Sequence, residues 1–163
     1  MSIESESKVL AKANALQRIR TLTHVLDNAI LIPGTTYRIG LDPIMGLIPG
    51  GGDTVGTMLS AYIVLEALRF GLPRDTLVRM VGNLALDGVL GTMPLLGDFF
   101  DATWKANSKN LALLEVHAAN PDESLAADRG FVIFIAVVVV AIALLITVLI
   151  ATLVTLLVRA ITG

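Results

Sequence analysis

A long uncharged run near the C-terminus constrains the fold more than any other feature of this chain. No residue from Phe131 to Val158 carries a charge, and Val, Ile, Leu and Ala dominate the run. A helix of this length reaches about 42 Å, beyond the roughly 30 Å hydrocarbon core of a bilayer. A core helix of a soluble protein is the alternative, but such helices are rarely apolar on every side. The run therefore predicts a tilted transmembrane helix over 131–159.

The residues around this span predict its orientation. Arg129 precedes the span and Arg159 follows it, with only four residues beyond. The functional body then lies before the span, as in a tail-anchored protein. Lys105 and Lys109 add to the positive charge on the N-terminal side, which favours a body on the cytoplasmic side of the membrane. The first residues are acidic and polar and lack the pattern of a signal peptide.

The composition agrees with a membrane protein and excludes some classes of function. Hydrophobic residues make up 55% of the chain, charged residues 16%, and the mean hydropathy is +0.78. A net charge of −2 argues against nucleic acid as a partner, since that binding needs a basic surface. The chain has no cysteine, so it has neither a disulfide nor a thiolate ligand or nucleophile.

Ahead of the span, one sequence pattern occurs twice. The segments 41–53 and 86–98 both read L-D-x-x-x-G-x-x-P-x-x-G-D. Such a duplication predicts two similar supersecondary units, over 41–68 and 86–113, related by a pseudo-twofold axis. In each unit the turn is formed by a proline and a glycine, and these turn residues are Pro49, Gly52, Pro94 and Gly97.

The aspartates of the repeat allow two interpretations. Asp53 and Asp98 stand before apolar, helix-compatible segments, and Asp75 follows the turn G-L-P; all three are predicted helix N-caps. If the arms of each unit are antiparallel, the aspartates of the two units approach one another. The candidate ion or proton site is then formed by Asp42, Asp53, Asp87 and Asp98, and an oxygen-ligated cation would relieve their repulsion. Which metal, if any, binds there is left open.

The remaining segments complete an all-α prediction. Apolar residues at three- and four-residue spacing predict an amphipathic helix from Glu4 to about Ile30, within an N-terminal region 1–32 that ends at Pro33-Gly34. An apolar core of helical hairpins follows over 33–117, then a linker over 118–130. The last arm of the core is polar, and Asp101 with Lys105 is expected to pair on its exposed face. We expect a membrane-associated helical bundle whose core lies at or partly in the membrane.

Several spaced motifs resemble an uncharacterised family, the domain of unknown function 4112. The resemblance covers about Asn14 to Glu115, and the terminal span is an addition to that core. The family implies no activity, cofactor or catalytic residue. The motifs that carry it are Leu41-Asp42-Pro43, Gly46-Leu47-Ile48-Pro49-Gly50, Gly52-Asp53, Asn83, Asp87, Pro94, Gly97-Asp98, Lys105-Ala106-Asn107, Asn110 and Leu113-Leu114-Glu115.

Two functions fit these observations. The chain has two histidines and no arrangement of nucleophile and base, so we expect no enzyme, no catalytic residue and no cofactor. The favoured hypothesis is a membrane-anchored scaffold or assembly subunit, which forms homo-oligomers or binds another membrane protein and has the lipid bilayer as a partner. The alternative is a small ion channel or transporter whose repeated aspartates line a pseudo-symmetric site.

Overall fold

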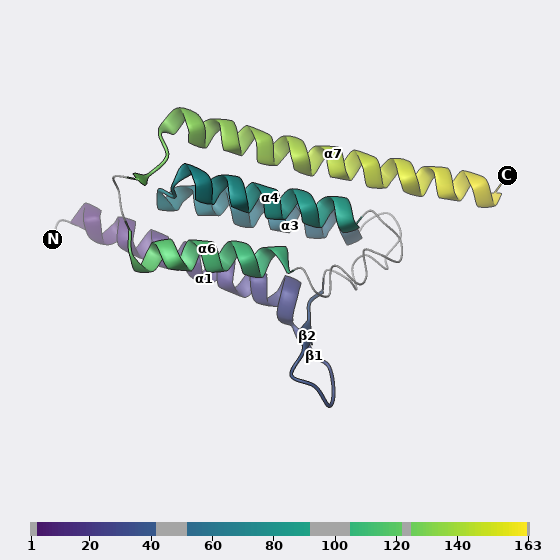
Figure 1. Ribbon diagram of the computed structural model, residues 1–163, viewed down its shortest axis with the longest axis horizontal. Coiled ribbons are helices and arrows are strands. Elements are labelled where there is room, and N and C mark those ends of the chain that lie inside the picture. Colours follow the sequence, from purple (N-terminus) through teal and green to yellow (C-terminus); the bar gives the residue numbers. More distant parts are fainter. Residues whose placement is uncertain (1–2, 42–51, 92–104, 122–124, 163) are drawn as a thin grey trace.

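The computed structural model describes residues 3–41, 52–91, 105–121 and 125–162. The described chain is mostly helical, as the sequence predicted. Its α-helices, labelled as in Figure 1, are α1 (Ile3–Asn28), α3 (Gly52–Ala67), α4 (Arg74–Gly91), α6 (Ala106–Ala119) and α7 (Arg129–Thr162).

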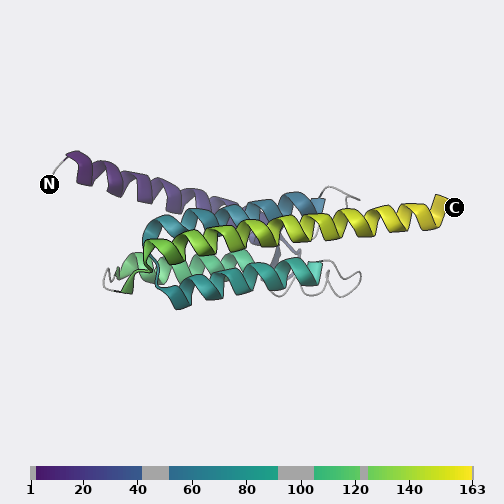
Figure 2. The ribbon, with the colours of Figure 1, turned by 90° about the horizontal axis from the view of Figure 1, so that it is seen from above.

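The axes of the helices are roughly parallel, and the helices form three layers. In Figure 1, α7 forms one outer layer, α3 and α4 the middle layer, and α1 and α6 the other outer layer. The chain direction alternates, so that α1, α4 and α7 run one way and α3 and α6 run the other (Figure 1). Figure 2 shows α7 lying over both α3 and α4, while the first turns of α1 diverge from the bundle.

A short β-hairpin follows α1, where the sequence predicted a longer helix. Helix α1 ends at Asn28, and β1 (Ile30–Leu31) pairs antiparallel with β2 (Arg38–Ile39). Gly34 adopts a φ of 81° in the connecting turn, a conformation that glycine reaches without steric cost. The strands were missed because a two-residue strand has no periodicity to detect.

The turn between α3 and α4 agrees with its sequence. A short 3-10 helix, η1 (Leu68–Phe70), ends at Gly71, which has a left-handed φ of 73°. Pro73 then directly precedes α4. Proline suits this position because its missing N–H would have no partner within the helix.

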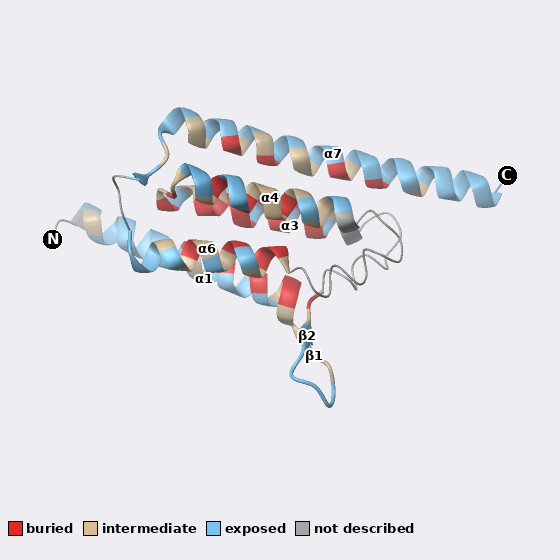
Figure 3. Cartoon of the chain, viewed as in Figure 1, coloured by how far each residue is buried: buried red, intermediate tan, exposed pale blue. Residues whose placement is uncertain are grey.

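The core is formed by apolar faces that converge from several helices. Buried residues gather on the inward faces of α1, α3, α4 and α6, as the red segments of Figure 3 show. The largest fully buried apolar side chains include Ile19, Leu26, Ile63, Leu77, Met80, Leu84 and Leu114. The first turns of α1 stay outside this core, and Val9 and Leu10 there are exposed.

Helix α7 packs on the body along one stripe. Its buried residues are Ile135, Val139, Ile146 and Ile150, which recur at helical spacing and face α3 and α4. Gly88 of α4 allows a close approach, since a Cβ there would lie 2.0 Å from Cδ1 of Ile146. Gly82, by contrast, has no such neighbour within 4 Å.

The segment between α6 and α7 is also attached to the body. The backbone N–H of Ala127 donates to the carbonyl of Leu72 at 3.0 Å, and Pro73 forms an isolated bridge with Ala126. The start of α7 is therefore held beside the turn between α3 and α4. The duplicated unit itself stays a prediction, because Pro49, Pro94 and Gly97 lie outside the described residues.

Candidate functional site

A buried carboxylate at the end of α1 holds the first turn of α6. Asp27 is only 6% exposed, and its Oδ2 accepts the backbone N–H of Ser108 at 2.6 Å. Its Oδ1 accepts a hydrogen bond from Asn107 Nδ2 at 2.9 Å. Ser108 is the third residue of α6, so its N–H has no partner within that helix. Asp27 thus caps α6 from another helix, and its charge lies at the positive end of the helix dipole.

Two further side chains extend this polar cluster toward the hairpin. Lys105 Nζ donates to Asn28 Oδ1 at 2.7 Å, and Asn28 Nδ2 donates to Ser108 Oγ at 3.0 Å. The ammonium also lies 4.9 Å from the centre of the Tyr37 ring. Lys105 precedes α6 and has a left-handed φ of 49°, so it does not lie on an exposed helix face as predicted. Asp101, its expected partner, lies outside the described residues.

A second pair of amides joins α6 to α4. Asn110 is 1% exposed; its Nδ2 donates to the carbonyl of Met80 at 3.3 Å, and its Oδ1 accepts from Asn83 Nδ2 at 2.8 Å. Asn107 is equally buried. The arm expected to be a polar surface helix therefore turns its asparagines inward, where their hydrogen bonds tie three helices together.

The structure describes only part of the predicted ion site. Asp42 and Asp98 lie outside the described residues. Asp53 is the second residue of α3, not the residue before it, and its side chain is not described. Asp87 lies half-buried in α4.

The predicted cap at Asp75 is displaced in the same way. Helix α4 starts at Arg74, so Asp75 lies inside the first turn instead of preceding it. Its exposed carboxylate still lies near the positive end of the helix. Across the described residues, no group of three or more His, Asp or Glu side chains is arranged to hold a metal ion. Both oxygens of Asp27 accept N–H groups, which makes this cluster a clamp between helices.

A second buried carboxylate joins α3 to α1. Glu66 is 7% exposed and pairs with the guanidinium of Arg18 on α1. Arg69 also reaches Glu66, with Nη1 at 3.1 Å from Oε1 and 3.3 Å from Oε2. The hydrogen bond to Glu66 is the main reason that the pKa of Arg18 is raised. Because both arginines remain largely exposed, solvent screens these pairs.

The start of α7 is fixed by a third carboxylate. Asp128 Oδ1 accepts the backbone N–H of Phe131 at 3.0 Å, which is the geometry of a helix N-cap. Asp128 also pairs with Arg74 of α4, whose guanidinium lies 5.0 Å from the centre of the Phe131 ring. The hydrogen bond from Phe131, and then the bond from Arg74, lower the pKa of Asp128.

Sequence reasoning missed these three carboxylates for different reasons. Asp128 carried a local signal, since it stands three residues before the apolar run begins at Phe131. Asp27 carried none, because its partner Asn107 lies 80 positions away in the chain. Glu66 has a local partner in Arg69, but its partner on α1, Arg18, lies 48 positions away.

The polar cluster and the helices that it joins coincide with a known family model. The model described as a domain of unknown function (DUF4112) matches residues 15–118, which is more than half of the chain. The chain belongs to this family. The match includes Asp27, Asn83, Asn107 and Asn110 and ends before α7, so the family resemblance expected from the sequence is confirmed. No curated protein and no solved structure matches the chain.

Proposed function

We propose that this protein is a membrane-embedded, non-enzymatic scaffold or assembly subunit. The observation that carries the proposal is the outer face of α7. This helix has 34 residues, is long and apolar enough to cross a bilayer, and keeps most of its apolar side chains exposed. Soluble proteins rarely expose a continuous apolar face of this size. The exposed side chains include Ile133, Phe134, Val137, Val140, Leu144, Leu145, Val148 and Leu149.

The middle layer adds to this apolar surface. Exposed apolar residues lie on α3 at Val55, Met58 and Tyr62, and on α4 at Val78 and Leu86. We therefore propose that α3 and α4 accompany α7 into the bilayer. The close α4–α7 contact at Gly88 suits this role, since helices in membranes associate through small residues.

The opposite layer has the character of a surface in contact with water or protein. Arg20 of α1 and Glu115 of α6 form an exposed ion pair at 2.7 Å, and Lys109 is exposed on α6. Placing such charged side chains against lipid costs free energy. The same proposal puts the end of the bundle where α7 begins on the cytoplasmic side of the membrane. It also includes self-association, or binding to a membrane protein, through this outer layer. The buried polar residues support a structural role for the protein, because Asp27, Asn83 and Asn110 hold helices together.

Charge substitution on the two outer layers tests the proposal. Leu145 of α7 and Val116 of α6 are similarly exposed, at 69% and 72%. Leu145→Arg should therefore leave the fold intact but move protein out of the membrane fraction that resists carbonate extraction. Val116→Arg is the matched control and should leave that fraction unchanged. A Leu145→Arg protein that stays in the membrane as the wild type does would contradict the proposal.

One observation keeps the alternative of an ion channel in view. The β1–β2 hairpin, the start of α3, the end of α4 and the start of α6 lie at the same end of the bundle (Figure 1). In purified liposomes a channel would conduct ions, and Asp42→Asn with Asp87→Asn would abolish the flux. The scaffold proposal predicts no flux from a well-folded protein.

A further inference from the structure

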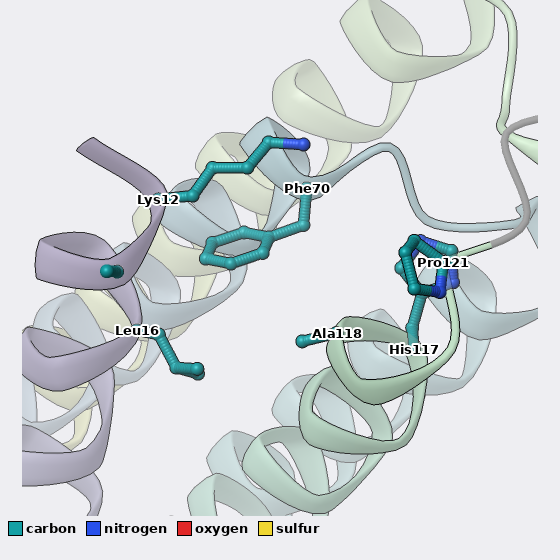
Figure 4. A pocket seen from close by; sticks show the side chains of 7 residues that line it. Lys12, Leu16, Phe70, His117, Ala118 and Pro121 are labelled. Atoms are coloured by element: carbon teal, nitrogen blue, oxygen red, sulfur yellow. The ribbon is translucent and has the colours of Figure 1, made fainter. Parts of the chain in front are cut away.

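A cavity at the end of the bundle where α7 begins has the chemistry of a lipid-headgroup site. It has a volume of about 220 Å³ and is bounded by α1, by η1 and by the C-terminal end of α6. Because three separate segments form it, the cavity is a product of the fold and not a feature of one helix. Figure 4 shows the side chains that line it, which are Lys12, Ala13, Leu16, Phe70, His117, Ala118 and Pro121.

The lining divides into an apolar floor and two basic side chains. In Figure 4, Lys12 and Leu16 lie on α1 at one side of the cavity, and His117 and Ala118 lie on α6 at the other. Phe70, which is 8% exposed, lies between them. Within the described part of the chain, no carboxylate forms an ion pair with Lys12. An ammonium that has no carboxylate partner among the described residues, beside an apolar floor, suits a ligand with an anionic group and an apolar part.

A second groove shares a wall with this cavity and enlarges the site. Its volume is about 580 Å³, and Lys12 lines both hollows. The second groove adds Lys8 and Arg69, whose side chains are mostly exposed. Among the described residues, Lys8 pairs only with the exposed Glu4, and Arg69 shares Glu66 with Arg18, so their charges are only partly neutralised.

The position of the site indicates where the ligand comes from. The cavity is bounded by η1 and by the C-terminal end of α6, which lie at the end of the bundle where α7 begins (Figure 1). Arg129 is the first residue of α7 and stands two residues before the apolar run. If α7 enters the bilayer, this end lies near the headgroups of one leaflet. We propose that the cavity and its neighbouring groove bind the phosphodiester headgroup of an anionic phospholipid, with Lys12 at the phosphate and Phe70 against the glycerol and upper acyl carbons. This inference rests on the proposed membrane role of the protein.

Binding of soluble, short-chain lipids to the full-length protein in a neutral detergent tests the inference. Dihexanoyl phosphatidylglycerol should bind at least fivefold more tightly than dihexanoyl phosphatidylcholine, because one ammonium near a headgroup contributes about that factor. Inorganic phosphate at the same concentration should compete weakly, since it cannot contact the apolar floor. Equal binding of the two lipids would overturn the proposal. If inorganic phosphate competes as strongly as the anionic lipid does, the site binds a free anion and the lipid proposal is overturned.

Two variants and a control identify the residues that bind the lipid. Lys12→Gln and Ala118→Glu alter exposed residues on opposite walls of the cavity, and each should weaken phosphatidylglycerol binding about fivefold. Arg38→Gln alters an exposed cation on the hairpin and should have no effect. Equal loss in Lys12→Gln and Arg38→Gln would show non-specific attraction and overturn the site.

Carbonate extraction of the same variants separates this inference from the membrane proposal. Lys12→Gln and Ala118→Glu should remain in the membrane fraction, because neither alters α7. A protein that is membrane-bound but has no lipid preference would refute the headgroup site alone. If the wild-type protein itself is absent from the membrane fraction, the proposed function is refuted.

Discussion

Removal of the Asp27 side chain should destabilise the bundle more than any other single exchange of a carboxylate. Asp27→Ala deletes the cap that accepts the N–H of Ser108, which costs about 1–2 kcal/mol for a helix N-terminus. It also leaves the buried amide of Asn107 without this acceptor, which costs about 1–3 kcal/mol. Since Asp27 is 6% exposed, water replaces these partners poorly, and the expected total loss is about 2–5 kcal/mol.

Denaturant unfolding in detergent, followed by circular dichroism, measures this loss. Asp75→Ala is the control, because Asp75 also lies at a helix start but is exposed, and it should lose at most about 0.5 kcal/mol. The double variant Asp27→Ala with Asn107→Ala should lose less than the sum of the single losses, because the two residues share a hydrogen bond. A loss below about 0.5 kcal/mol in Asp27→Ala would refute the clamp.

Three further exchanges have clear expected outcomes. Glu66→Gln should lose about 1–2 kcal/mol in the same unfolding experiment, because it removes the ion pairs with Arg18 and Arg69. Gly88→Val should lose about 1–3 kcal/mol by overpacking against Ile146, whereas Gly82→Val, with open space around it, should lose less than half as much. Because the pKa of Asp128 is lowered, its carboxylate stabilises the fold at pH values above the ordinary pKa of 3.8, and this stabilisation is lost as the pH falls through the lowered pKa. The wild type should therefore lose its stability advantage over Asp128→Asn below about pH 4, in an acid titration followed by circular dichroism.

The sequence predicted the elements of this fold better than their arrangement. The length of the uncharged run was enough to predict the helix over 131–159, and the spacing of the apolar residues was enough to predict most of α1. Neither indicates which face of a helix meets which neighbour. The apolar run was expected to follow a separate body, yet Ile135, Val139 and Ile146 pack against α3 and α4. Such packing depends on contacts between distant residues, which a single sequence does not reveal.

The candidate site was less predictable than the fold. Asparagines on a helix are usually read as a solvated face, so Asn107 and Asn110 were assigned to the surface. They are buried because Asp27, from a helix far away in sequence, offers a partner. Conversely, the aspartates of the repeat drew attention through local spacing alone. Asp53 of the repeat, and Asp75 outside it, fall one residue inside their helices, a shift within the usual uncertainty of helix boundaries.

Spin labels on the two outer layers test the central claim, the contact of α7 with lipid, most directly. The chain has no cysteine, so single cysteines at Val140, Leu145 and Val116 can each carry one nitroxide without competing labels. In liposomes we expect Val140 and Leu145 to be accessible to oxygen, which concentrates in lipid, and shielded from a water-soluble nickel complex. Val116 should show the reverse. Nickel access at Val140 and Leu145 equal to that at Val116 would contradict the account.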